Sequence, residues 1–162
     1  KILGKDKDLK KIRKKVDHAL VTVGLINKPE IRENLFKLIK KLKFKITSIK
    51  SPLAHVSKSA TVGAGTIIFH HAIINANARI GKNCIINNRA LIEHDVNISD
   101  GCHISTGAII NGNCNVGKNT FIGSGAIVSN NINIIKNSFV KLGQRIIKNL
   151  NNEKKKKKKL IN

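Results

Sequence analysis

The chain has 162 residues and a formal net charge of +22, and aromatic residues make up only 3% of it. This length fits one domain, or one domain and part of another. Because Trp, Tyr and Met are absent, small aliphatic side chains have to fill the core. No apolar run reaches the roughly 18 residues of a membrane span, and no signal peptide is recognisable. We therefore expect a cytoplasmic protein with no membrane partner.

The positive charge is concentrated at the two ends of the chain. Residues 1–50 carry 16 Lys and Arg against 5 acids, residues 51–146 carry 8 against 3, and residues 147–162 carry 7 against 1. We interpret residues 149–162 as a solvated, Lys-rich, disordered tail. Nucleic acid is not expected as a partner, because aromatic residues for base stacking are lacking.

Residues 1–50 are predicted to form a small, partial α/β subdomain. Residues 17–24 resemble a buried strand that ends in a glycine turn. Pro29 opens an amphipathic helix over residues 30–43, and residues 44–49 form a further strand. A first strand with a Gly-rich phosphate loop is missing from this pattern. Either the chain is a truncated two-domain protein, or its small domain is reduced.

A six-residue repeat follows the boundary at Ser51-Pro52. From Val56 to Ile146, every sixth residue is Val or Ile. A small residue comes four positions after most of them, and the position loosens late in the repeat to Ile132, Ser138 and Gln144. Gly or Asn usually precedes this position, as a left-handed backbone turn favours. Three such units make an 18-residue triangular coil, and stacked coils pair as parallel strands. Residues 51–148 are therefore predicted to form a parallel β-helix, whose handedness the period alone does not fix.

The same register places the three cysteines. Cys84, Cys102 and Cys114 all occupy the small position inside a corner, where Ala and Thr stand elsewhere. Their spacing matches no metal-binding motif. We interpret them as small buried hydrophobic residues in a reducing compartment, with no part in a disulfide or a metal site.

The corner position departs from Gly or Asn at four places, which are Ser59, His71, Arg89 and Asp95. Asp95 is of most interest because it follows His94, and His103 comes nine residues after His94. Corner side chains point outward. In a trimer of prisms, His94 would line the groove between neighbouring subunits, where a long, thin ligand could lie.

The stretch around this pair is the most specific part of the sequence. Residues 86–95, with residues 103–108 and 111–113, resemble the hexapeptide-repeat acetyltransferases that act on sialic acids or on nucleotide-linked 4-amino-sugars. The resemblance covers residues 18–146. It implies a left-handed parallel β-helix, a homotrimer, acetyl-CoA as co-substrate, no metal, and a sugar or nucleotide-sugar acceptor.

The resemblance also implies catalytic roles. His94 would be the general base that accepts a proton from the attacking amino or hydroxyl group, a task for which imidazole is suited near neutral pH. Asp95 would orient the ring and stabilise its charged form.

The remaining implied roles concern binding. The family contacts acetyl-CoA at positions that correspond to His103, Gly112 and Ser124. Gly24 and Asn87 match positions on the acceptor side. Gly112 follows His94 by 18 residues, so it should lie one coil above it, where its backbone N–H could bond the thioester oxygen.

The chain departs from the family at both ends, and other functions stay open. The Gly-rich acceptor loop is missing, Lys141-Leu142-Gly143 replaces a run of small residues, and the Lys-rich tail replaces the usual closing loop. The chain could be a degenerate trimer that only assembles, or a basic protein that binds nucleic acid. A metal-dependent carbonic anhydrase on the same prism would draw its ligands from His70, His71, His94 and His103. The sequence does not name the acceptor or decide between an amide and an ester product.

Overall fold

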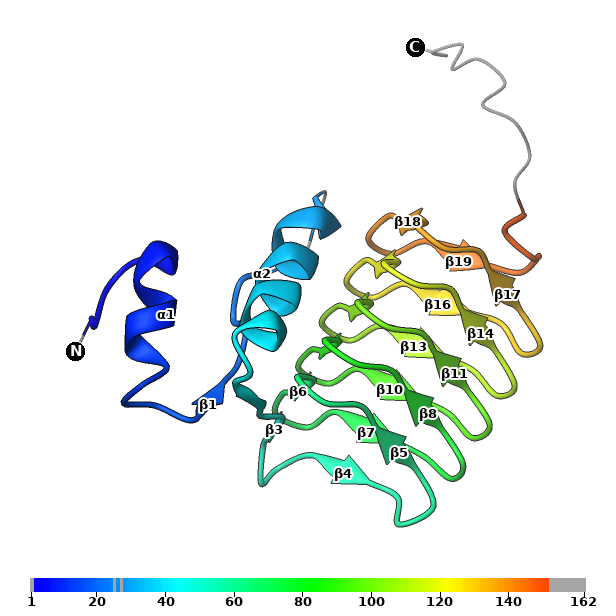
Figure 1. Ribbon diagram of the computed structural model, residues 1–162. Helices are drawn as coiled ribbons and strands as arrows, with labels where there is room; N and C mark the ends of the chain where they lie inside the picture. The colour runs from blue at the N-terminus through cyan, green and yellow to red at the C-terminus, as the bar shows by residue number, and fades with distance from the viewer. Residues whose placement is uncertain (1, 25, 27, 152–162) are drawn as a thin grey trace, which may run out of the picture.

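The computed structural model describes residues 2–24, 26 and 28–151, and most of them form a three-sided prism of parallel strands (Figure 1). Each side of the prism is one sheet, which we name after its first strand. The β3 sheet contains β3 (Ile49–Lys50), β6 (Ile67–Ile68), β9 (Ile85–Ile86), β12 (His103–Ile104), β15 (Phe121–Ile122) and β18 (Phe139–Val140). The β4 sheet contains β4 (His55–Val56), β7 (Ile73–Ile74), β10 (Leu91–Ile92), β13 (Ile109–Ile110), β16 (Ile127–Val128) and β19 (Arg145–Ile146). The β5 sheet contains β5 (Thr61–Val62), β8 (Arg79–Ile80), β11 (Asn97–Ile98), β14 (Asn115–Val116) and β17 (Asn133–Ile134).

Every inner strand of the prism pairs with the strands 18 residues before and after it, as β10 does with β7 and β13. The second residue of each prism strand occupies the inward position, and from Ile68 to Ile146 these Val and Ile side chains are almost fully buried in one continuous core. The predicted corner residues have positive φ at every position from Gly65 to Gly143, and Ser59 is the exception. The predicted left-handed parallel β-helix is thus confirmed. Cys84, Cys102 and Cys114 are unpaired and buried inside the corners.

The prism extends beyond the predicted repeat at both ends. Strand β3 pairs with β6 although it precedes Val56 and the boundary at residue 51. The Val/Ile pattern misses β3 because its inward position is Lys50, which is exposed at the open end of the prism. At the other end, Leu150 forms a bridge to Ile134. Of the expected tail, residues 152–162 lie outside the described part of the chain.

Apart from β3, the described residues among 2–50 form a smaller unit beside the prism. A short 3₁₀ helix (Asp6–Asp8) leads into α1 (Leu9–Ile12), β1 (His18–Ala19) pairs in parallel with β2 (Lys45–Ile46), and α2 (Pro29–Lys41) connects them. The predicted helix is confirmed, and Pro29 stands in its first turn. The two predicted strands are shorter than expected. Residues 44–49 divide into β2, which pairs only with β1, and the start of β3, which belongs to the prism.

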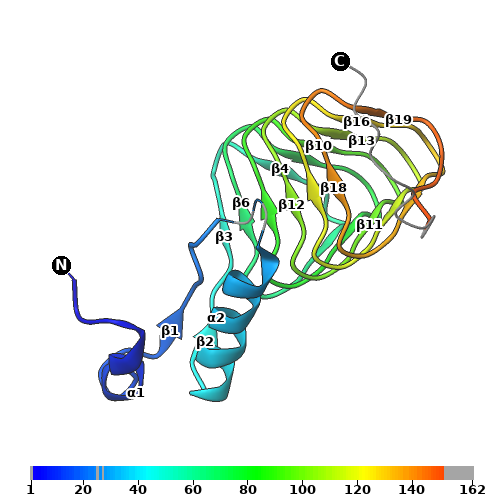
Figure 2. The ribbon, with the colours of Figure 1, turned by 90° about the horizontal axis from the view of Figure 1, so that it is seen from above.

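Helix α2 lies against the prism, and α1 stands further out (Figure 2). At the contact, a Cβ on Gly65 would lie 2.6 Å from a ring carbon of Phe36, so the close approach requires glycine there. Glu33 on the same helix accepts hydrogen bonds from Lys118 at 2.9 Å and Asn119 at 3.1 Å. None of the helices in the described residues is long and apolar enough to cross a membrane.

The buried side chain of Arg32 ties the two units together. It is 1% exposed and donates to the carbonyl oxygens of Val21 and Val23, both at 2.7 Å, and to that of Asn83 at 3.2 Å. Burial lowers the pKa of this guanidinium. Since Asn83 belongs to the prism, one side chain joins the segment after β1 to a corner of the prism.

The three outer faces of the prism differ in chemistry. On the β5 sheet the outward residues are polar and exposed. On the β4 sheet they form an apolar stripe of Ile73, Leu91, Ile109 and Ile127, all at least partly exposed. On the β3 sheet, Ile67, Ile85 and His103 point outward and yet are buried, on the side that residues 2–50 occupy (Figure 2).

Candidate functional site

His94 and Asp95 lie at the corner between the β4 and β5 sheets, which we call the His94 corner. Asp95 has φ of 59°, the left-handed conformation that turns the chain at each corner, and Asp tolerates it better than most residues. His94 Nδ1 lies 2.8 Å from Asp95 Oδ2, and both side chains are more than half exposed. A carboxylate only accepts hydrogen bonds, so Nδ1 donates and Nε2 of the neutral ring is the nitrogen that can accept a proton.

Asp95 is held ionised by its neighbours. The hydrogen bond from His94 is the main cause that lowers the pKa of the Asp95 carboxyl, and a hydrogen bond from Asn77 acts in the same direction. Asn77 donates to Asp95 Oδ1 at 3.2 Å from the coil below. The sequence analysis did not name Asn77, although its position 18 residues before Asp95 is a signal that could have found it.

Gly112 lies directly against the His94 ring. A Cβ on Gly112 would be 2.8 Å from both Cε1 and Nε2 of His94, so any larger residue would push the ring away. The backbone N–H of Gly112 has no acceptor among the described residues. The proton-accepting nitrogen and a backbone donor are therefore adjacent, as expected from the 18-residue spacing.

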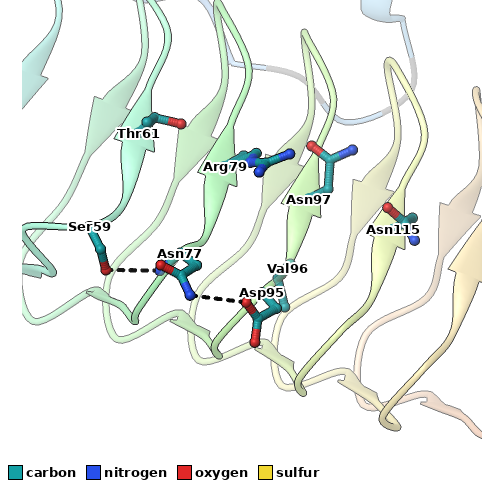
Figure 3. A pocket seen from close by; sticks show the side chains of 8 residues that line it. All are labelled: Ser59, Thr61, Asn77, Arg79, Asp95, Val96, Asn97 and Asn115. Atoms are coloured by element: carbon teal, nitrogen blue, oxygen red, sulfur yellow. Dashed lines mark hydrogen bonds between the residues drawn. The ribbon is translucent and has the colours of Figure 1, made fainter.

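A polar hollow of about 460 Å³ opens beside Asp95 on the β5 sheet (Figure 3). It is lined by Ser59, Thr61, Asn77, Arg79, Asp95, Val96, Asn97 and Asn115. Hydroxyl, amide and guanidinium groups thus surround the carboxylate. Such groups can bond the hydroxyls of a polyol or an anionic group.

The other predicted binding residues lie at a different corner, between the β3 and β4 sheets. Asn87 Nδ2 is 3.5 Å from His103 Nε2, and the Ser124 hydroxyl is 2.9 Å from that of Ser105. His103 is 8% exposed and meets the edge of the Phe121 ring. The structure therefore brings Asn87 and His103 together, and Ser124 contacts Ser105 on the coil of His103.

Within one chain, these residues are separated from His94 and Asp95. His103 stands on the β3 sheet, and the His94 corner is the one opposite that sheet in the triangular coil. Gly24 is exposed on the segment after β1, next to Val23, whose carbonyl Arg32 holds. Across the described residues, no group of three or more His, Cys, Asp or Glu is arranged to hold a metal ion.

Solved structures share this architecture. A histidine variant of perosamine N-acetyltransferase from Caulobacter crescentus, in complex with CoA and GDP-perosamine, aligns with 26% identity and a TM-score of 0.88 over 92% of this chain and 70% of that one. The acetyltransferase domain of PglB from Neisseria gonorrhoeae FA1090 aligns with 27% identity and a TM-score of 0.76, over 78% of this chain and 62% of that one. The same domain has also been solved in complex with acetyl coenzyme A.

WeeI from Acinetobacter baumannii AYE shares the fold, with 21% identity over 85% of this chain and 71% of that one and a TM-score of 0.51. No curated protein matches the chain. The chain spans less than two thirds of the PglB domain.

The fold and these neighbours place the chain among the hexapeptide-repeat acyltransferases, as the resemblance predicted. Residues 50–159 match the model of the GMPPB C-terminal domain family, which is more than half of the chain. The chain belongs to the GMPPB C-terminal domain family.

Proposed function

We propose that the chain transfers the acetyl group of acetyl-CoA to an amino or hydroxyl group of a sugar, in particular of a nucleotide-linked sugar. The observation that carries this proposal is the hydrogen bond between His94 Nδ1 and Asp95, which leaves Nε2 facing the buried Gly112. Similar structures bind CoA, acetyl coenzyme A or GDP-perosamine, which supports the choice of substrates. The unpaired buried cysteines fit a cytoplasmic location, which we also propose.

His94 acts as the general base in this proposal. Its Nε2 accepts the proton of the acceptor amine or hydroxyl while that group bonds to the acetyl carbon. Asp95 accepts the Nδ1 hydrogen bond and stabilises the ring while it is charged. The Gly112 N–H donates to the carbonyl oxygen as that oxygen gains negative charge. Acetyl-CoA supplies the thioester, whose carbon–sulfur bond breaks, and the proton held on His94 goes to the departing thiolate.

The proposed use of His94 and His103 in one site needs more than one copy of the chain. His94 and His103 lie on opposite sides of a single prism, so one site can use both only if they come from different subunits. We propose a homotrimer in which His103, Gly112 and Ser124 contact acetyl-CoA and Asn87 and Gly24 contact the acceptor. The hollow beside Asp95 offers further hydrogen-bonding groups for sugar hydroxyls.

The apolar stripe of the β4 sheet is the surface that this trimer would bury. Its residues, Ile73, Leu91, Ile109 and Ile127, lie in register on successive coils. A contiguous apolar patch on a prism face next to His94 is typical of a subunit interface. Ile109→Asp places a charge in the middle of the stripe, so we expect a monomer by light scattering with an unchanged circular dichroism spectrum. A trimer that survives this change would count against this interface.

The catalytic assignment is tested by His94→Asn. Loss of a general base lowers rates by about 10²- to 10⁴-fold, and the exposed corner should stay folded. We expect acetyl transfer to a 4-amino-sugar nucleotide or to sialic acid to fall by that factor, with little change in coenzyme A affinity. His103→Ala is the matched comparison, and it should weaken coenzyme A binding more than it slows the chemical step. Full activity in His94→Asn would refute the mechanism.

A further inference from the structure

Three aromatic rings form a ladder on the outside of the β3 sheet. His103, Phe121 and Phe139 occupy the outward positions of β12, β15 and β18, one coil apart. His103 meets Phe121 edge-on with ring centroids 5.1 Å apart, and Phe121 stacks on Phe139 at 4.9 Å with 12° between the planes. Phe139, at the upper end of the described ladder, is 50% exposed.

Phe139 and Phe69 are the two exposed Phe side chains of the chain. There are five Phe residues and no Trp or Tyr in the whole sequence. Among the described residues, the prism core contains Ile, Val, Ala and Cys side chains and no aromatic ring. A large apolar side chain that is half exposed and stacked in order is a candidate for ligand contact.

A pocket of about 350 Å³ lies between the ladder and the first turn of α2. Phe121 and Phe139 line one side, and Pro29 and Glu30 line the other. Asn137 and Ser138 also line it, and the Asn137 side chain has no hydrogen-bond partner in the part of the chain that the structure describes. The lining of the pocket therefore combines two apolar rings with amide and carboxylate groups.

The dimensions of the ladder suit one further flat ring. The 4.9 Å step from Phe121 to Phe139 is close to the spacing of neighbouring strands, so a ring stacked on Phe139 continues the ladder by one step. Offset stacking favours planar systems over aliphatic ones. The Asn137 amide and the Glu30 carboxylate can bond the edge of a heterocycle, which an aliphatic ligand cannot use.

Helix α2 adds an electrostatic preference. It begins at Pro29, and Lys28 before it provides no side-chain cap. The positive end of the helix dipole consequently lies beside the pocket. The Glu30 carboxylate in the first turn offsets part of it, and the remainder favours a negatively charged group there. A planar base that carries a phosphate satisfies both the ladder and the helix end.

We propose that this pocket binds the base of a nucleotide, stacked on Phe139 with Asn137 and Glu30 at its edge. The inference rests on the proposed function for the identity of the nucleotide. Two substrates could supply it: the adenine of acetyl-CoA, or the base of the nucleotide-linked acceptor. The shared chemistry is a planar heterocycle linked to phosphate.

The test uses the whole chain and calorimetric titration with two kinds of probe. Adenosine 3′,5′-bisphosphate represents the nucleotide end of coenzyme A, and GDP and UDP represent the acceptor. Stacking on an aromatic residue contributes about 1–3 kcal/mol per base. Phe139→Ala should therefore lower the binding affinity for one of the probes roughly 5- to 150-fold. Phe69→Ala is the matched control, because Phe69 is also exposed on the prism and does not line the pocket.

A second variant tests the inference if Phe139→Ala fails to fold. Phe139→Trp keeps a stacking ring and introduces the only Trp of the chain, whose fluorescence should be quenched by the probe that binds. Selective weakening of adenosine 3′,5′-bisphosphate identifies the adenine of coenzyme A, and selective weakening of GDP or UDP identifies the acceptor base.

The remaining outcomes refute the inference. Unchanged binding of every probe by Phe139→Ala, or a wild-type chain that binds none of them, would overturn it. Failure of the proposed function alone would give a different result. The wild-type chain would then show no acetyl transfer, and its nucleotide binding would still depend on Phe139.

Discussion

The prism and residues 2–50 are held in place by different kinds of interaction. In the prism, each coil buries Val and Ile against identical neighbours and shares backbone hydrogen bonds with the coils above and below. Residues 2–50 have a small core around Val21, Ile39 and Phe44. Their attachment to the prism includes the buried Arg32 and the hydrogen bonds of Glu33.

This difference determines where single substitutions act. Stability of a stacked repeat is approximately a sum of equal contacts between neighbouring coils, and many of them support the His94 corner. The junction depends on a few individual side chains instead. A change there should loosen α2 and the Phe139 pocket while the His94–Asp95 pair keeps its geometry.

The largest effect is expected from Ile110→Ala in the middle of the prism. Ile110 is fully buried between coils, and removal of such a side chain typically costs about 2–5 kcal/mol of unfolding free energy. Urea denaturation followed by circular dichroism measures this loss. Ile39→Ala makes the same change in the smaller core, which can partly collapse around the cavity, so its cost should be at or below the lower end of that range. A larger loss of unfolding free energy in Ile39→Ala than in Ile110→Ala would contradict this prediction.

A smaller effect is expected from Arg32→Met, which keeps the length of the side chain and removes its donors. The carbonyls of Val21 and Asn83 then lose a buried partner, and an unmet buried acceptor costs about 1–3 kcal/mol. Hydrogen exchange should become faster in residues 2–50 and stay unchanged in the prism. Arg79→Met is the control, because Arg79 is exposed on the β5 sheet. Equal protection of residues 2–50 in both variants would show that Arg32 does not hold the junction.

Most of the fold could be predicted because the period of six repeats the same physical requirement in every coil. The inward Val and Ile, the small corner residues and the positive φ of the corners follow from it. The repeat did not predict strand β3, because Lys50 at the open end of the prism does not need to be apolar. The sequence did not predict the short α1 either, because four residues carry too little periodicity to distinguish a helix from a charged loop.

For the candidate site, the sequence could predict only the contacts that follow from spacing along the chain. The adjacency of His94 and Asp95, and the position of Gly112 one coil above, follow from sequence spacing. The sequence did not reveal that His94 and His103 face opposite sides of one prism, because that depends on how three sheets close into a triangle. The Phe139 pocket also depends on where α2 docks, and no repeat encodes that contact. The roles of these residues in catalysis and binding stay predictions.

The smallest effect, and one that depends on pH, is expected at Glu33. Its hydrogen bonds with Lys118 and Lys37, in that order, lower the pKa of the Glu33 carboxyl to about 2. The pKa of Glu in an unfolded chain is about 4.3. The ionised form therefore stabilises the folded state fully above that pH. The contribution is lost as the pH falls from about 4.3 towards 2, because the unfolded chain binds the proton first.

Glu33→Gln removes the charge and keeps the shape, so it should lower the unfolding free energy by up to about 1 kcal/mol at pH 6, the upper range for surface ion pairs. The measurement compares urea unfolding of the wild type and Glu33→Gln at pH 6 and near pH 2. The difference between the two proteins should shrink at the lower pH, where Glu33 of the wild type is also becoming neutral. High salt should shrink it at pH 6 as well, because Lys118 and Lys37 are exposed and screened. A difference that stays constant across pH and salt would mean that the shape of Glu33, and not its charge, holds α2 against the prism.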